Sequence, residues 1–161
     1  MTPSEHAGPY GTRQPFTFLV QGCPCTLREG MAEFAAAQPG LLRPSDPELA
    51  RFIAAHDACH VLFGLTTVVE DEAIADLWTL FGSDMPVRRY AGYLRHPELA
   101  SLFVEVGAWQ ITKVMLRGLP RIVRTIVRVR RMRVRWAFWG YADHLDTPVA
   151  DLRQRFGVQL M

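Results

Sequence analysis

Two histidines and an aspartate stand close together in the stretch HDACH at residues 56–60, inside an otherwise apolar segment. On a helix, His56 and His60 are four positions apart and therefore lie on one face, with Asp57 next to the first of them. Imidazole nitrogens and carboxylate oxygens are donors with which proteins bind divalent metals. The spacing predicts a metal site, although a His-Asp pair is also a common hydrogen-bonded structural feature.

Glu72 adds a second carboxylate to this candidate site. It follows His60 by twelve positions, so one straight helix would separate the two by about 18 Å, too far to share an ion. A break between Gly64 and Thr67 would let a second helix turn back and place Glu72 opposite the histidines. Two imidazoles and two carboxylates suit zinc, iron or manganese, and the spacing does not choose among these metals. The predicted ligands are His56, Asp57, His60 and Glu72.

A second local signal lies at residues 117–135, a segment with many arginines and no acidic residue. The arginines recur at steps of four and three, which makes one row on a helix, and isoleucines and valines form the other face. Such a helix is typical of a membrane-surface element or an anion-binding face, and the alternative is a solvated charged face over the core. This arginine row consists of Arg117, Arg121, Arg124, Arg128, Arg131 and Arg135.

Small and bulky residues are mixed at residues 102–116. Small residues in an apolar helix can leave a groove for a long hydrocarbon, or they can allow close packing against another helix. If a lipid groove exists, its predicted lining is Phe103, Gly107, Trp109 and Ile111.

The chain has 161 residues, which suits one compact domain that buries roughly 70% of the surface of the unfolded chain. Its formal net charge of +2 and sequence pI near 8.6 do not favour a polyanion binder, so we expect no nucleic acid partner. No stretch approaches the ~18 consecutive apolar residues of a membrane-spanning helix. Any membrane contact is expected to be peripheral.

The three cysteines are Cys23, Cys25 and Cys59. An odd number without a secretory signal predicts reduced thiols in a cytosol-like compartment. Cys23 and Cys25 could form half of a metal site, but the chain offers no second pair at a suitable spacing, and they can equally be loop residues.

Helical periodicity rather than strand-like alternation runs through most of the chain, which predicts an all-α fold. We expect a single-domain helical bundle at residues 26–161, preceded by an irregular, unpacked N-terminal arm at residues 1–25 that is rich in Pro and Gly. Predicted capping boxes are Ser45 with Glu48 and Thr67 with Glu70. The expected helices cover residues 27–37, about 45–64, 67 to about 81, 97–116, 119 to beyond 135, and 147–157.

The pattern His-Asp-x-x-His, followed by eleven residues and Glu, resembles the signature of the coenzyme Q biosynthesis protein 4 family. In this chain it is formed by His56, Asp57, His60 and Glu72. The sequences HVLFGL at residues 60–65 and DLRQRFGV at residues 151–158 resemble the same family in the same order. The resemblance covers about residues 45–160.

This resemblance implies an all-α, membrane-associated protein of ubiquinone synthesis whose four motif residues bind a divalent metal. It further implies a polyprenylated aromatic ligand, association with other ubiquinone biosynthesis enzymes, and oxidative removal of the ring carboxylate with hydroxylation at that carbon. We expect a bacterial, cytoplasmic protein peripheral to the inner face of the membrane. Whether the chain forms a homodimer stays open.

Two other functions compete with this one. A non-catalytic scaffold could bind an isoprenoid lipid and use the metal only for its structure. A metal-dependent phosphohydrolase also carries a His-Asp doublet, but it needs a further upstream histidine and a distant aspartate, and only His6 lies upstream here.

Overall fold

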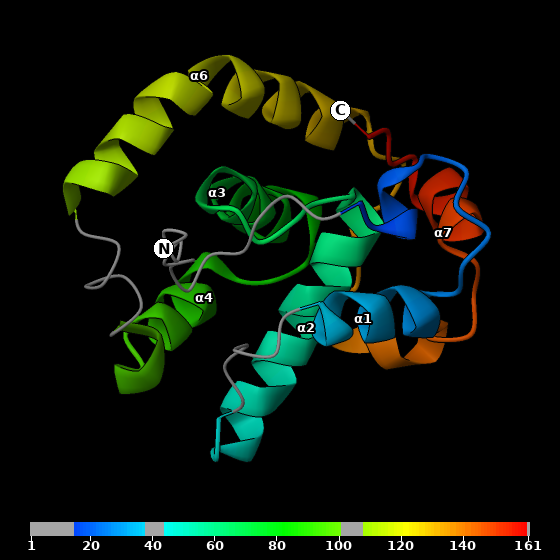
Figure 1. The fold of residues 1–161 in the computed structure, drawn as a ribbon, viewed down its shortest axis with the longest axis horizontal. Coiled ribbons are helices and arrows are strands. Elements are labelled where there is room, and N and C mark those ends of the chain that lie inside the picture. The colour runs from blue at the N-terminus through cyan, green and yellow to red at the C-terminus, as the bar shows by residue number, and fades with distance from the viewer. Residues whose placement is uncertain (1–14, 38–43, 101–107, 161) are drawn as a thin grey trace, which may run out of the picture.

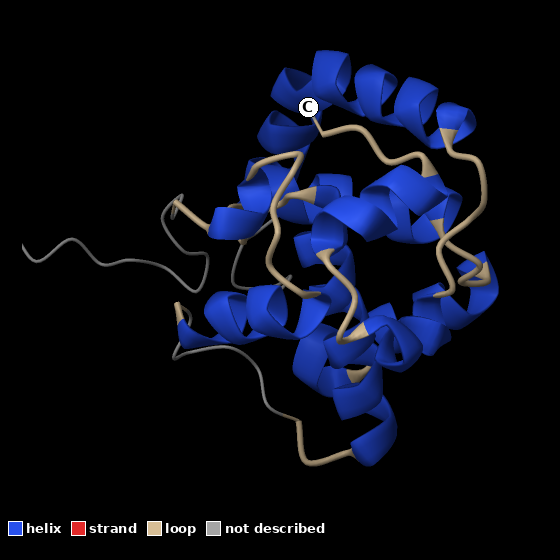
Figure 2. Cartoon of the chain, turned by 90° about the vertical axis from the view of Figure 1, so that its right-hand side faces the viewer, coloured by secondary structure: helices blue, strands red, loops and turns tan. Residues whose placement is uncertain are grey.

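The structure is a computed structural model that describes residues 15–37, 44–100 and 108–160. These residues form helices joined by loops, and none of them belongs to a strand (Figures 1 and 2). The expected all-α, single-domain fold is confirmed.

Helices α1 (Leu27–Ala36) and α2 (Pro47–Phe63) pack against each other near the centre of the fold. The N-terminal cap of α2 is Asp46 and not Ser45 as predicted. The Asp46 carboxylate accepts hydrogen bonds from the backbone amides of Glu48 and Leu49. The predicted end of α2 is confirmed, since Gly64 adopts a left-handed conformation with φ of 64°.

Helix α3 (Val69–Leu77) turns back along α2 and ends in a π-helical turn, η2 (Trp78–Gly82). The predicted capping box of Thr67 and Glu70 is wrong, because Val68 is the capping position and has no side-chain cap. Instead, Thr66 donates both its amide and its hydroxyl to the buried Asp71 carboxylate, at 2.8 and 2.6 Å. These bonds shape the turn that the metal-site prediction requires.

Helix α6 (Ala108–Arg131) arches over α3, and the two pack side by side (Figure 1). Two helices with a break near residue 118 were predicted, but α6 continues through Pro120. Proline cannot donate a bond to the Leu116 carbonyl. The loss of this hydrogen bond is tolerable because Leu116 is 64% exposed, so water can reach that side of the helix and bond to the carbonyl.

The end of α6 also differs from the prediction, which carried the helix beyond Arg135. Arg133 donates its backbone amide to the Phe156 carbonyl, and Trp136 donates its own to the Gly82 carbonyl. These two amides are therefore not available for further helical turns, and α6 ends at Arg131.

Further helices among the described residues are α4 (Val87–Leu94), the 3-10 segment η3 (Phe138–His144) and α7 (Val149–Phe156). Residues 97–100 are also helical, as predicted for the start of the helix at 97–116, and residues 101–107 lie outside the described part of the chain. The prediction for α7 is confirmed, with Gly157 at its end in the left-handed conformation. Helix α4 was not predicted. It starts after Pro86 without a side-chain cap and contains a glycine, so its start lacks a capping signal and its interior holds one poor helix former.

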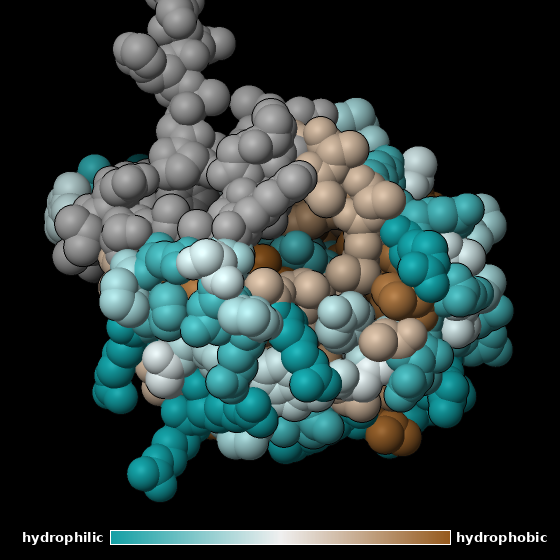
Figure 3. Space-filling model, turned by 90° about the horizontal axis from the view of Figure 1, so that it is seen from below, coloured by the Kyte–Doolittle hydropathy of each residue, from teal (hydrophilic) through white to brown (hydrophobic). Residues whose placement is uncertain are grey.

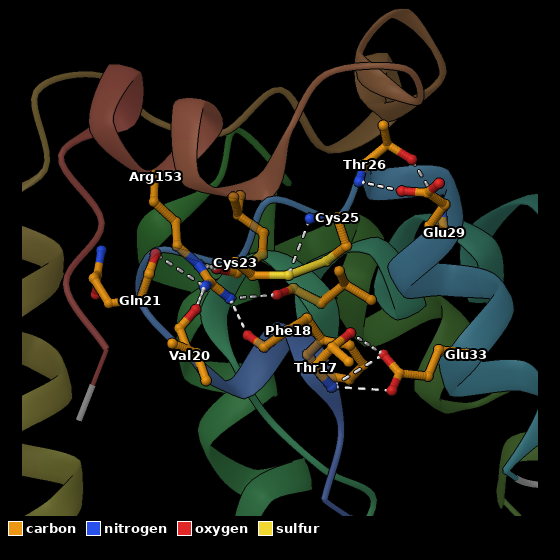
Figure 4. Close-up of a disulfide and its surroundings, with 12 residues drawn as sticks. Thr17, Phe18, Val20, Gln21, Cys23, Cys25, Thr26, Glu29, Glu33 and Arg153 are labelled. Atoms are coloured by element: carbon orange, nitrogen blue, oxygen red, sulfur yellow. Dashed lines mark hydrogen bonds between the residues drawn. A yellow bond between two sulfur atoms is a disulfide. The ribbon is translucent and has the colours of Figure 1, made fainter.

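The described part of the N-terminal arm, residues 15–25, is packed rather than free. Phe16 and Phe18 are buried, with Phe18 in the short 3-10 turn η1 (Thr17–Leu19). The buried Arg153 of α7 donates hydrogen bonds to the carbonyls of Phe18 and Val20 (Figure 4). The expectation of an unpacked arm is wrong for this part.

The cysteines also differ from the expectation. Cys23 and Cys25 form a disulfide, so these two thiols are not reduced and do not form half of a metal site (Figure 4). Cys59 is a free, buried thiol on α2.

The face seen from below is hollowed near its middle. Hydrophobic residues gather beside this hollow, and hydrophilic residues lie to the right of them and below (Figure 3). On the opposite side of the fold, α6 adds exposed apolar side chains, which are described with the arginine row below.

Candidate metal centre

Three predicted ligands meet where α2 and α3 face each other. His56 and His60 lie one turn apart on α2, and Glu72 projects from the first turn of α3. Their ligand atoms all lie within 4.8 Å of one another. The His56 and His60 Nε2 atoms are 3.2 Å apart, and the Glu72 Oε2 atom lies 3.6 Å from the first and 3.4 Å from the second.

These distances fit a bound metal ion. The centre of a triangle with edges of 3.2, 3.4 and 3.6 Å lies about 2 Å from each corner, and zinc–nitrogen and zinc–oxygen bonds are about 2.0–2.2 Å long. One ion could therefore reach all three atoms with little movement of the side chains. Three protein ligands leave a position open, as in catalytic rather than closed structural sites.

Asp57, the fourth predicted ligand, is not a member of this group. It is the next residue after His56 and therefore points about 100° away around α2. Burial raises the pKa of Asp57 to about 6, although the charges of His60 and His56 oppose the shift. Asp57 thus lies close enough to influence the histidines without joining the three ligand atoms.

The charges within the group stabilise one another. Burial lowers the pKa of His60, but the Glu72 carboxylate overcomes this effect and raises that pKa to about 9. Burial raises the pKa of Glu72, but His60 and His56 hold it well below its usual range. Near neutral pH these shifts favour an ionised Glu72 and a protonated His60 when no metal is bound. A bound cation would replace that proton as the positive charge.

Neighbouring side chains orient the two imidazoles. The His56 ring stacks at 6.2 Å on Phe52, and the His60 ring lies 5.0 Å from Phe34. The Thr79 hydroxyl is 3.5 Å from His56 Nδ1, where it can accept the proton of a ring that binds metal through Nε2. His60 Nδ1 is buried and has no hydrogen-bond partner among the described residues.

Two polar residues beside the group were not predicted. Asp76 lies one turn after Glu72 on α3 and accepts a hydrogen bond from the Tyr90 hydroxyl of α4. Burial raises the pKa of Asp76, and the charge of His56 opposes the shift. The Glu72–Asp76 spacing could have indicated Asp76. Tyr90 had no such signal, because α4 itself was not predicted.

The structure divides the arginine row. Arg121 forms an ion pair with the buried Asp71, and Arg128 donates to the Gln159 carbonyl at 3.2 Å. Arg135 lies beyond the end of α6, contrary to the prediction of one continuous helix. The exposed members on α6 are Arg117, Arg124 and Arg131.

The outer face of α6 is apolar beside these arginines. Val123 and Val127, on the predicted apolar face of this helix, are 58% and 42% exposed and do not face the core. Because α6 packs on α3 and Thr125 is buried while these valines are exposed, the valines lie on the outer side of the helix. Together with Leu116, and with Trp109 at 70% exposed, they form an apolar stripe with spacings of seven and four.

The predicted lipid groove lies largely outside the described residues. These do not include Phe103, Gly107 or the Ile111 side chain. Trp109 is described and is exposed at the start of α6.

Among the described residues, no helix is both long enough and apolar enough to span a membrane. Comparisons of this chain with protein families, with curated proteins and with solved structures gave no match.

Proposed function

We propose that this protein is a metal-dependent member of the coenzyme Q biosynthesis protein 4 family that acts on a polyprenylated aromatic acid. The observation that carries the proposal is the meeting of His56, His60 and Glu72 at distances that suit one divalent ion. Two histidines and one carboxylate with open positions are also the ligand set of non-haem iron oxygenases. Zinc and manganese remain compatible with the same donors.

In the proposed reaction the bond between the ring and its carboxylate breaks, carbon dioxide leaves, and a hydroxyl group takes its place. This is a two-electron oxidation, which balances if one dioxygen and one water are consumed and one hydrogen peroxide is released. A divalent metal in the site would act as a Lewis acid toward the carboxylate. His56, His60 and Glu72 would bind that ion where α2 and α3 face each other. Asp57, with a pKa near 6, could hold or release a proton beside them.

The outer face of α6 supports a peripheral membrane location for this activity. Its apolar stripe of Trp109, Leu116, Val123 and Val127 runs beside a row of exposed cationic residues. Such a face can place apolar side chains in the boundary of a bilayer and its cations on anionic head groups.

The scaffold alternative uses the same cluster as a structural metal site. The open position argues against this alternative, since structural zinc sites usually have four protein ligands. The two functions differ in the expected effect of His60→Ala. In the enzyme, the substitution removes metal and turnover while the folded protein persists. In the scaffold, it lowers stability, and ligand binding fails only as folding fails.

The test is an assay of carboxylate loss from a polyprenylated hydroxybenzoate with iron-, manganese- or zinc-loaded protein. Wild type is compared with His60→Ala, and thermal unfolding of both is recorded. Metal-dependent turnover that His60→Ala abolishes supports the proposal. Tight substrate binding without turnover for any of the three metals would favour the scaffold. Binding of neither substrate nor metal would overturn both.

A further inference from the structure

Arg153 of α7 is buried, yet no carboxylate among the described residues pairs with it. All of its N–H groups donate to backbone carbonyls, so its charge is solvated by peptide dipoles (Figure 4). Two of these carbonyls lie in the last turn of α2, the negative end of that helix dipole. The acceptors are Phe18, Val20, Gln21, Val61 and Leu62.

This arrangement leaves a positive charge inside the protein without an anion. Burial lowers the pKa of Arg153 to about 10, so the guanidinium is still charged near neutral pH. Since every N–H of Arg153 is already engaged, it cannot donate to a further ligand. It can only contribute its positive field to the surface next to it.

A cavity of about 530 Å³ opens beside Arg153, between the end of α6, α7 and the N-terminal segment. Its lining includes Arg131 and Arg133, and none of the described residues that line it is an aspartate or glutamate. Both of these side chains are exposed and form no ion pair with a carboxylate of the described residues. Gln154 and Gln159 add neutral amide groups to the lining.

Gly157 lets the end of α7 lie close to the segment that carries Arg131 and Arg133. Its φ of 72° is a conformation that other residues rarely adopt, and a Cβ there would lie 3.0 Å from the Arg133 backbone nitrogen. The Arg133 amide in turn donates to the Phe156 carbonyl at 2.9 Å. The positions of Arg131 and Arg133 at the rim are therefore built into the fold.

We propose that this cavity binds the phosphate or diphosphate group of a small molecule or lipid. Two free guanidinium groups can each donate paired hydrogen bonds to a phosphate group, and the field of Arg153 favours a multiply charged anion. The volume exceeds that of a single inorganic ion and lies within the usual range for small-molecule sites. The inference does not rest on the metal centre, because the two sites share no residue.

The experiment is isothermal titration of the full chain with inorganic diphosphate at low salt. The test variant is Arg131→Gln with Arg133→Gln. The control, Arg117→Gln with Arg124→Gln, removes the same charge from exposed α6 positions outside the cavity. We expect about tenfold or greater weakening in the test variant and less than about twofold in the control. Circular dichroism and metal content should be unchanged in both, which separates this result from failure of the metal centre.

The inference is overturned if wild type binds no diphosphate up to millimolar concentrations, or if both double variants lose affinity equally. Equal loss would mean that diffuse surface charge, rather than the cavity, attracts the anion.

A second experiment uses phosphatidylcholine vesicles with and without phosphatidic acid. Binding that requires phosphatidic acid and is competed by free diphosphate assigns the cavity to a lipid head group. Diphosphate binding without any vesicle preference assigns it to a soluble phosphate compound.

Discussion

Replacing Arg153 by Met should destabilise the protein strongly, because one side chain ties three segments together. The guanidinium joins α7 to the end of α2 and to the N-terminal segment through hydrogen bonds to backbone carbonyls. Methionine fills similar volume and cannot donate any of these bonds. The carbonyls of Phe18, Val61 and Leu62 would then be buried without their donor.

The magnitude follows from two opposing effects. Hydrogen bonds that involve a charged group contribute roughly 1.5–3 kcal/mol each, so three buried bonds amount to about 5–9 kcal/mol. The variant no longer buries a charge, which returns several kcal/mol. We therefore expect the free energy of unfolding to fall by about 4 kcal/mol, a large share of the ~5–15 kcal/mol typical of a small domain.

The assay is chemical unfolding in urea, followed by circular dichroism. Arg155→Met is the matched control, since Arg155 lies on the same helix and is exposed. Its effect should stay within about 0.5 kcal/mol. A loss below about 1 kcal/mol for Arg153→Met, or equal losses for the two variants, would refute the view that Arg153 holds these segments together.

Three further predictions concern other parts of the molecule. In metal-free protein, the pKa of His60 is raised to about 9 and that of Glu72 is lowered, so stability should decline as pH rises from about 6.5 through 9 and as pH falls below about 4.5. Thermal unfolding across pH checks this, and a flat profile from pH 6 to 9 would contradict it. Burial raises the pKa of Cys59 to about 12, so a thiol reagent should not react with the native protein. After unfolding without reductant it should react with one thiol, that of Cys59, because Cys23 and Cys25 stay paired. Three reactive thiols after such unfolding would contradict the disulfide. Val123→Glu with Val127→Glu should weaken sedimentation with anionic vesicles by at least about tenfold, because both valines are exposed on α6. Unchanged sedimentation would exclude this face from membrane contact.

The main part of the metal centre could be predicted from local sequence. The i, i+4 spacing of His56 and His60 needs only a helix, and Gly64 signals its end through the left-handed conformation that glycine favours. The turn that brings Glu72 back could be expected from the break after Gly64. The exclusion of Asp57 could also have been expected, since adjacent residues on a helix point about 100° apart.

The features that were missed depend on contacts between distant segments. Helix α6 ends at Arg131 because the following amides bond to Phe156 and Gly82, which are far away in the sequence. The carbonyl of the buried Phe18 accepts a hydrogen bond from Arg153, another long-range partner. Periodicity within a segment carries no information about such partners, so it could not show that the segment around Phe18 is packed.

The most direct test of the central claim is the metal content of purified protein, measured by mass spectrometry after reconstitution with iron, zinc or manganese. Glu72→Gln keeps the shape of the side chain but removes its charge, and Glu70→Gln makes the same change at an exposed position on the same helix. We predict about one equivalent of metal in wild type and Glu70→Gln, and a loss of at least tenfold in affinity in Glu72→Gln. Wild type without metal after reconstitution, or Glu72→Gln with undiminished affinity, would contradict the assignment of this cluster as a metal centre.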